Sequence, residues 1–110
     1  MDQLQALKKL AKKVEEGDAD WTCNPARKAI GRALAASTHQ AFHGSVDSAI
    51  SLIKPVLGDG WTWASADDAN DERYSLVHNN VEEFDAYNPC AARALLLAII
   101  NAKIADMEAA

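Results

Sequence analysis

The chain has 110 residues, of which 49% are hydrophobic, 6% aromatic and 25% charged. This length supports one hydrophobic core, and this balance excludes a multidomain enzyme, a disordered chain and a disulfide-stapled scaffold. We therefore expect a single domain over residues 1–110. It should have N-terminal helices in residues 1–36, followed in residues 45–108 by a helix, a strand meander and a long C-terminal helix.

Eleven Lys and Arg residues face sixteen Asp and Glu residues, which gives a net charge of −5. An acidic chain is a poor ligand for duplex nucleic acid, whose phosphates attract cationic proteins, so we expect no duplex partner. The charge is unevenly distributed. Residues 1–54 carry eight basic and six acidic side chains, and residues 55–110 carry three basic and ten acidic ones. A local basic patch is therefore expected in the first half.

No segment of the sequence predicts export or membrane insertion. The start, MDQLQALKKL, lacks the apolar stretch of a signal peptide. The longest apolar run, residues 94–100, is far shorter than the roughly 20 residues of a membrane span. The two cysteines, Cys23 and Cys90, lack CxxC spacing and are expected to be reduced thiols. These features predict a cytoplasmic protein without a membrane partner.

The first half of the chain predicts three helices. Residues 2–16 place apolar side chains on one stripe, and Gly17 ends this helix. Asn24 and Pro25 supply an N-cap and a first-turn proline for a second helix, whose apolar side extends to Leu34. Residues 38–44 fit either a short edge strand or a loop. Ser45 then caps a third helix, which Pro55 and Gly58 are expected to end.

The second half predicts strands and a final helix. Residues 60–65 form a strand with Trp61 and Trp63 on one face. Residues 73–78 and 81–87 form two more strands, with a polar turn at 66–71 and an Asn79-Asn80 turn between them. Phe84 and Ala86 should face one side of the last strand, and Glu83 and Asp85 the other. Asn88-Pro89 starts a helix over residues 89–108.

The predicted fold class is α+β: a three- to four-stranded antiparallel sheet packed by four helices in an α-β-α sandwich-like arrangement. The last helix is apolar around most of its circumference. Such a helix needs cover on two sides, and in a one-core domain a second copy of the chain can supply it. This pattern predicts a homo-oligomer, most simply with two-fold symmetry.

Residues 38–105 resemble a family of small phage proteins. A helix of the form SVDSAISLIKPVLGDGWTW leads into paired strands, which are followed by FDAYNPCAARALLLAIINAKI. This order resembles the phage ABA sandwich family, in which an Ala- and Leu-rich helix of the type TPALALC-ALL follows the last strand. Here Asn88-Pro89-Cys90 replaces the usual Thr-Pro-Ala and keeps a capping side chain. The resemblance implies an α-β-α layered domain that a phage or prophage encodes and that acts in the host cytoplasm. It implies no catalytic residues.

One cluster of metal-binding residue types does not predict a metal site. His39, His43 and Asp47 are spaced by four residues, which on one helix would place them on one face. Gly44 and the cap at Ser45 interrupt that helix, so polar loop histidines are the favoured interpretation.

Carboxylates also gather in the second half. Glu82, Glu83 and Asp85 lie on one predicted strand and favour a solvated strand face over paired acid–base catalysis. The turn that contains Asp67, Asp68 and Asp71 lacks the glycine and glutamate of a calcium-binding loop.

A cluster for binding an anion lies at the start of the second helix. Within twelve residues the sequence places Trp21, Asn24, Arg27, Lys28 and Arg32. A helix start presents free N–H groups to a phosphate, and arginine adds forked donors. Trp21 can stack on a nucleobase.

Further flat surfaces come from Trp61, Trp63 and Tyr74 on the predicted strands. Together with the basic cluster, they predict a site for a small phosphorylated aromatic ligand.

The sequence carries no GxSxG and no P-loop, so we expect no enzyme and no cofactor. The leading hypothesis is a phage anti-defence sponge. It would sequester a host nucleotide immune signal, of the cyclic dinucleotide or ADP-ribose type, in a pocket between subunits. The alternative is an inhibitor that contacts a host protein through the acidic surface of residues 67–72 and 82–85. A third hypothesis is a small nucleotide-cleaving enzyme.

Overall fold

The computed structural model describes residues 3–17, 29–67 and 73–109. Four α-helices, one short 3₁₀ helix and three strands have their bounds within these residues. They are α1 (Gln3–Glu16), η2 (Arg32–Leu34), α3 (Ala35–Phe42), α4 (Val46–Leu57), β1 (Thr62–Asp67), β2 (Arg73–His78), β3 (Glu83–Asn88) and α5 (Ala91–Ala109). The strands form one antiparallel sheet in the order β1-β2-β3. The predicted α+β class and the strand meander are confirmed.

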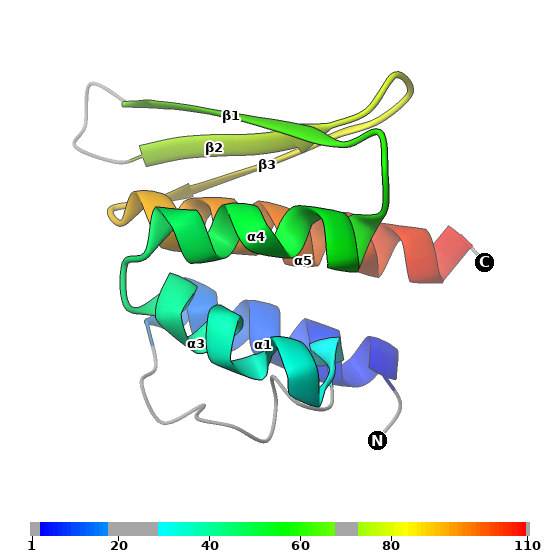
Figure 1. Ribbon diagram of the computed structural model, residues 1–110, viewed down its shortest axis with the longest axis horizontal. Helices are drawn as coiled ribbons and strands as arrows, with labels where there is room; N and C mark the ends of the chain where they lie inside the picture. Colours follow the sequence, from blue (N-terminus) through cyan, green and yellow to red (C-terminus); the bar gives the residue numbers. More distant parts are fainter. Residues whose placement is uncertain (1–2, 18–28, 68–72, 110) are drawn as a thin grey trace.

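The elements form three layers (Figure 1). The sheet is the outer layer, α4 and α5 lie beneath it, and α1 and α3 form the layer farthest from the sheet. This order differs from the expected α-β-α arrangement, because all the described helices lie on one side of the sheet. The other sheet face carries exposed side chains, among them Ala64, Asp85 and Tyr87.

Helix α5 is the centre of the core. Its buried residues point in every direction around the helix: Ala92, the whole run 94–100, and Ala102. The sheet covers one side, and α1, α3 and α4 cover the others. The apolar surface of α5 is therefore buried by its own chain. The expectation that a second copy is needed to cover this helix is wrong. The homo-oligomer itself stays a prediction. No helix in the described part of the chain is long and apolar enough to cross a bilayer.

Helix α1 forms as its apolar stripe predicts. Leu7, Leu10 and Val14 are fully buried against α5. Gly17 ends the helix with a φ of 72°, which favours glycine, and its N–H donates to the carbonyl of Val14.

The segment between residues 29 and 44 corrects two predictions. Ala29 and Ile30 are helical, but Gly31, with a φ of 105°, ends that helix before Leu34. Residues 38–44 are mostly helical, because α3 continues to Phe42. Thr38 is fully buried in α3, and its hydroxyl donates to the carbonyl of Leu34 at 2.9 Å, which offsets the cost of burying it.

Helix α4 begins at the predicted cap, where the Ser45 hydroxyl accepts from the N–H of Ser48 at 3.2 Å. It does not end at Pro55, which lies within its last turn, but at Gly58. The carbonyl of Ser51 loses its helical donor at Pro55. Both residues are exposed, so water can satisfy this carbonyl and the helix continues.

The sheet differs from prediction mainly at its first strand and its second turn. Strand β1 begins at Thr62, so Trp61 precedes it and does not share a strand face with Trp63. In the second turn, Asn79 Oδ1 accepts from the N–H groups of Val81 and Glu82 at 2.8 and 2.7 Å. The Asn79 N–H donates to the Glu82 carbonyl, so Asn80 and Val81, rather than Asn79 and Asn80, are the central turn residues.

Strand β3 alternates as predicted. Phe84 and Ala86 face the helices, and Glu83 and Asp85 are exposed on the other face.

Candidate anion-binding pocket at the start of α5

The eight residues of the predicted ligand site do not meet in one described pocket. Four of them, Trp21, Asn24, Arg27 and Lys28, lie outside the described residues, as does Cys23. The other four are described: Arg32, Trp61, Trp63 and Tyr74.

Arg32 lies apart from the three aromatic residues. It is exposed at the first position of η2, close to α3. The sheet lies on the far side of the α4 and α5 layer (Figure 1). Within one chain, Arg32 and the aromatic residues of the sheet therefore do not form a common surface.

The three aromatic residues also occupy separate places. Trp61 is half-buried against the core, with its ring 6.1 Å from that of Phe84. Trp63 pairs with Val77 and lies on the helix-facing side of the sheet, where it is 37% exposed. Tyr74 lies on the opposite face of the sheet, because it is three positions before Val77 and successive side chains of a strand alternate between the faces.

Tyr74 makes a small cluster on the open sheet face. Its ring lies 5.0 Å from that of Tyr87, and its hydroxyl donates to Asp85 Oδ2 at 3.2 Å. Desolvation, followed by the hydrogen bond and charge of Asp85, raises the pKa of Tyr74 above its usual value of about 10. At physiological pH this phenol is therefore a neutral hydrogen-bond donor.

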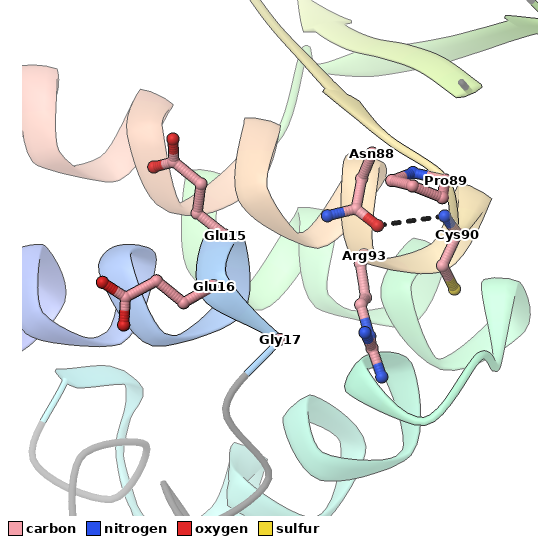
Figure 2. A pocket seen from close by; sticks show the side chains of 7 residues that line it. All are labelled: Glu15, Glu16, Gly17, Asn88, Pro89, Cys90 and Arg93. Carbon is pink, nitrogen blue, oxygen red and sulfur yellow. Dashed lines mark hydrogen bonds between the residues drawn. The ribbon is translucent and has the colours of Figure 1, made fainter. Parts of the chain in front are cut away.

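A pocket of about 360 Å³ lies where the end of α1 meets the start of α5 (Figure 2). Its lining comes from two chain segments: Glu15, Glu16 and Gly17 on one side, and Asn88, Pro89, Cys90 and Arg93 on the other. None of these residues belongs to the predicted ligand site.

The side chain of Asn88 builds one wall of this pocket. Asn88 is 8% exposed, and its Oδ1 accepts from the N–H of Cys90 at 3.0 Å. The prediction that Asn88 is the N-cap of a helix starting at Pro89 is wrong, because α5 begins at Ala91 and Cys90 accepts its first helical hydrogen bond; Asn88 closes the turn that precedes the helix. Figure 2 shows the amide nitrogen pointing the other way, toward the side of Glu15. This nitrogen has no hydrogen-bond partner among the described residues, so a buried double donor is left for a ligand.

Arg93 is fixed between three helices. Its Nε donates to the carbonyl of Phe42 at 2.7 Å, and its guanidinium lies 4.1 Å above the centre of the Phe42 ring. A Cβ at Gly17 would lie 3.4 Å from Nη1, an ordinary contact distance, so the end of α1 lies next to the guanidinium. No hydrogen bond joins Nη1 or Nη2 to the described part of the chain. The fold therefore holds Arg93 in place through Nε and leaves its forked donors available.

The charges of the pocket are opposite to those that helix dipoles favour. Arg93 lies in the first turn of α5, where a carboxylate would be more stable, and that turn holds no acidic residue. Glu15 and Glu16 end α1, where a cation would be more stable. The last turn of α1 also holds Lys13, so the departure from the dipole rule is clearest at Arg93. This local rule could have singled out Arg93 from the sequence.

The pocket has a cationic wall and an anionic wall. Arg93, the Asn88 amide and the first N–H groups of α5 can hold a phosphate or carboxylate. Glu15 and Glu16, both exposed, can accept hydrogen bonds from amino groups. Cys90 adds a half-buried free thiol. The described residues include no group of three or more His, Cys, Asp or Glu side chains arranged to hold a metal.

Comparison with protein-family models, curated proteins and solved structures found no match to this chain. The resemblance to the phage ABA sandwich family therefore stays a prediction.

Proposed function

We propose that the protein is a non-enzymatic binding protein for a small phosphorylated ligand, whose phosphate is held at the start of α5. The observation that carries this proposal is the Arg93 guanidinium. Phe42 fixes it through a hydrogen bond and ring contact, while its terminal nitrogens lack partners among the described residues and line the pocket. A donor that is ordered before binding loses little conformational entropy when the ligand arrives.

Three kinds of donor belong to residues that line the pocket or lie at the start of α5. Arg93 offers two nitrogens in the fork geometry that suits phosphate oxygens. The Asn88 amide offers a neutral donor, and the first turn of α5 offers backbone N–H groups with no partner within the helix. The positive end of this 19-residue helix adds to the attraction.

The opposite wall consists of Glu15, Glu16 and Gly17, and Figure 2 shows the two carboxylates directed away from Asn88 and Arg93. Glu15 and Glu16 repel a bare anion but accept hydrogen bonds from amino or ring N–H groups, which nucleobases carry. At about 360 Å³ the pocket is near the small end of ligand sites, which span about 300–1,000 Å³. It therefore suits a ligand of mononucleotide size better than inorganic phosphate.

The finer proposal is an anti-defence sponge of a phage or prophage. A cyclic dinucleotide or ADP-ribose derivative has two phosphates and exceeds one such pocket. It would need added surface, either from a second copy or from the chain beyond Gly17, which carries Trp21, Arg27 and Lys28. Both the ligand identity and the phage context rest on the sequence-based hypothesis.

A ligand panel tests the proposal. The protein is titrated by calorimetry with AMP, ADP-ribose, cyclic di-AMP and inorganic phosphate, and each mixture is then heat-denatured and analysed by mass spectrometry. A binding protein releases an intact nucleotide on heating, with inorganic phosphate bound more weakly. A converted nucleotide would show an enzyme instead, and no heat with any nucleotide would refute the proposal.

A second candidate function uses the open face of the sheet. Glu83, Asp85 and Tyr87 are exposed there, next to the half-buried Tyr74. Carboxylates interleaved with tyrosines suit an inhibitor that contacts a basic surface of another protein. If the protein inhibits another protein in this way, changing Glu82 and Glu83 to Gln should abolish inhibition of that protein. Asn88→Asp, which changes the pocket and not the sheet face, should leave that inhibition unchanged.

A further inference from the structure

Strand β1 differs from the rest of the sheet in having almost no cover. It is an edge strand of the sheet that the described residues form, in which it pairs only with β2. Helix α5 packs beneath β2 and β3 and barely reaches β1. As a result, every residue from Thr62 to Ala66 is exposed, on both faces of the strand. Trp63 is the largest of them, and it faces the helix side without being buried there.

The two edges of the sheet are protected differently. Strand β3 carries Glu83 and Asp85, and Pro89 follows it directly. Charges and proline are the usual means of preventing an edge from pairing with another strand. Residues 62–66 of β1 read TWASA and contain neither, and the charge of this strand is confined to its last residue, Asp67. Their outer row of backbone N–H and C=O groups is therefore open to a further strand.

We propose that β1 pairs antiparallel with β1 of a second copy, forming a continuous six-stranded sheet across a two-fold axis. The strand order would be β3-β2-β1-β1-β2-β3, with the helical layers of both copies on one side. The occupant is a second copy because the strand is complementary to itself. Residues opposite each other in an antiparallel pair share a face, so an axis through Ala64 places Trp63 opposite the partner's Ser65.

This register gives Trp63 the cover that it lacks. The Ser65 hydroxyl bonds the Ser75 hydroxyl at 2.8 Å within its own chain, so it requires no other partner. A small, satisfied side chain leaves room for an indole to lie across it. The symmetry repeats this contact, so both tryptophans lose exposed apolar surface.

The net charge of each copy and the small buried area both limit the affinity between two β1 strands. Each copy carries a net charge of −5, which opposes association, but residues 62–66 place no charge at the contact itself. Pairing residues 62–66 of two copies buries less than the roughly 1,200 Å² of a standard interface. We therefore infer a reversible dimer that depends on concentration and that strengthens when salt screens the net charge.

Sedimentation velocity over a hundredfold range of concentration, at low and moderate salt, tests this proposal. The expected result is a monomer–dimer equilibrium that shifts toward the dimer with concentration and salt. Ala64→Lys and Ala64→Glu should each reduce the association constant by about tenfold or more, because like charges then face each other near the axis. An equimolar mixture of the two variants should restore the dimer.

The matched control is Val81→Lys. It makes the same apolar-to-lysine change at a residue 88% exposed in the β2–β3 turn, and it should leave association unchanged. Circular dichroism should show a native fold in every variant, because Ala64 and Val81 are both exposed. A chain that stays monomeric at every concentration would overturn the proposal. So would a dimer that Ala64→Lys leaves intact or that the mixture of variants fails to restore.

Discussion

Helices α4 and α5 begin in similar ways and yet differ in what their first turns leave for a ligand. At each start a short polar side chain accepts from a backbone N–H: Ser45 at the N-cap of α4, and Asn88 two residues before the N-cap of α5. At α4 the Ser45 hydroxyl also bonds the Ser48 hydroxyl, which in turn bonds Gln40, and Asp47 complements the helix dipole. The α4 start is therefore satisfied by its own residues.

The α5 start is not satisfied in this way. Its first turn holds Arg93 where a carboxylate would be expected, and the Asn88 amide nitrogen lacks a partner among the described residues. The difference teaches that a cap alone does not make an anion site. A site also needs hydrogen-bond donors that the fold holds in position and that have no acceptor within the protein.

The most disruptive test of this comparison is Arg93→Ala. It removes the charged hydrogen bond from Arg93 Nε to the carbonyl of Phe42, worth about 1–3 kcal/mol, and a cation–π contact of about 0.5–1 kcal/mol. Urea denaturation should show this loss, and calorimetry should show no nucleotide binding. If nucleotide binding survives unchanged in protein that is still folded, Arg93 is only a structural clamp.

Asn88→Asp separates binding from stability. The aspartate can still accept from the Cys90 N–H and favours the helix start, so the free energy of unfolding should hardly change. It replaces the amide donor with a negative charge, so the affinity for AMP should fall by about tenfold or more. The matched change at α4, Ser45→Ala, should affect stability and not binding. It should cost about 1 kcal/mol of stability and leave binding unaltered.

The acidic wall predicts a gain of binding. Glu15→Gln together with Glu16→Gln removes the repulsion of a bare anion, so inorganic phosphate should bind several-fold more tightly than to the unchanged protein. Stability should rise by about 0.3–1 kcal/mol, because negative charge at the end of α1 opposes its dipole. Competition between phosphate and AMP measures the change. Unaltered selectivity would show that these carboxylates do not face the ligand.

The smallest expected effect is a dependence of stability on alkaline pH at Tyr74. Its pKa is higher in the folded chain than in the unfolded one, so the folded state retains the proton more strongly. The resulting stability is present below about pH 10 and is lost as the pH rises through the folded value. The melting temperature of the wild type should therefore decline more steeply above pH 10 than that of Tyr74→Phe. Equal slopes would contradict the assignment.

The sequence predicted those elements whose causes are local. The stripe in α1, the Ser45 cap and the alternation in β3 all depend on residues within or next to one element. Helix α3 was missed because its polar sequence gives a weak helical pattern. What stabilises it is the burial of Phe42 and Thr38 by the rest of the fold.

Two errors came from contacts between distant segments. The apolar circumference of α5 was evident, but the sequence did not show that the sheet and three helices of the same chain would cover it. The first-turn position of Arg93 was visible in the sequence, but the contact that fixes its guanidinium was not, because Phe42 is 51 residues away. Of the predicted ligand residues, Arg32, Trp61, Trp63 and Tyr74 are present but separate, since sequence proximity and residue type do not fix which layer or face they occupy.

The central claim is that ligand phosphate is held at the start of α5. It is tested most directly by following ¹⁵N–¹H spectra of the protein during a titration with AMP. The account predicts that the largest shifts occur at the Asn88 side-chain amide, the Arg93 Nε–H and the backbone N–H groups of Ala91 and Ala92. Shifts confined to the indole N–H groups of Trp61 and Trp63, with the α5 start unchanged, would contradict it.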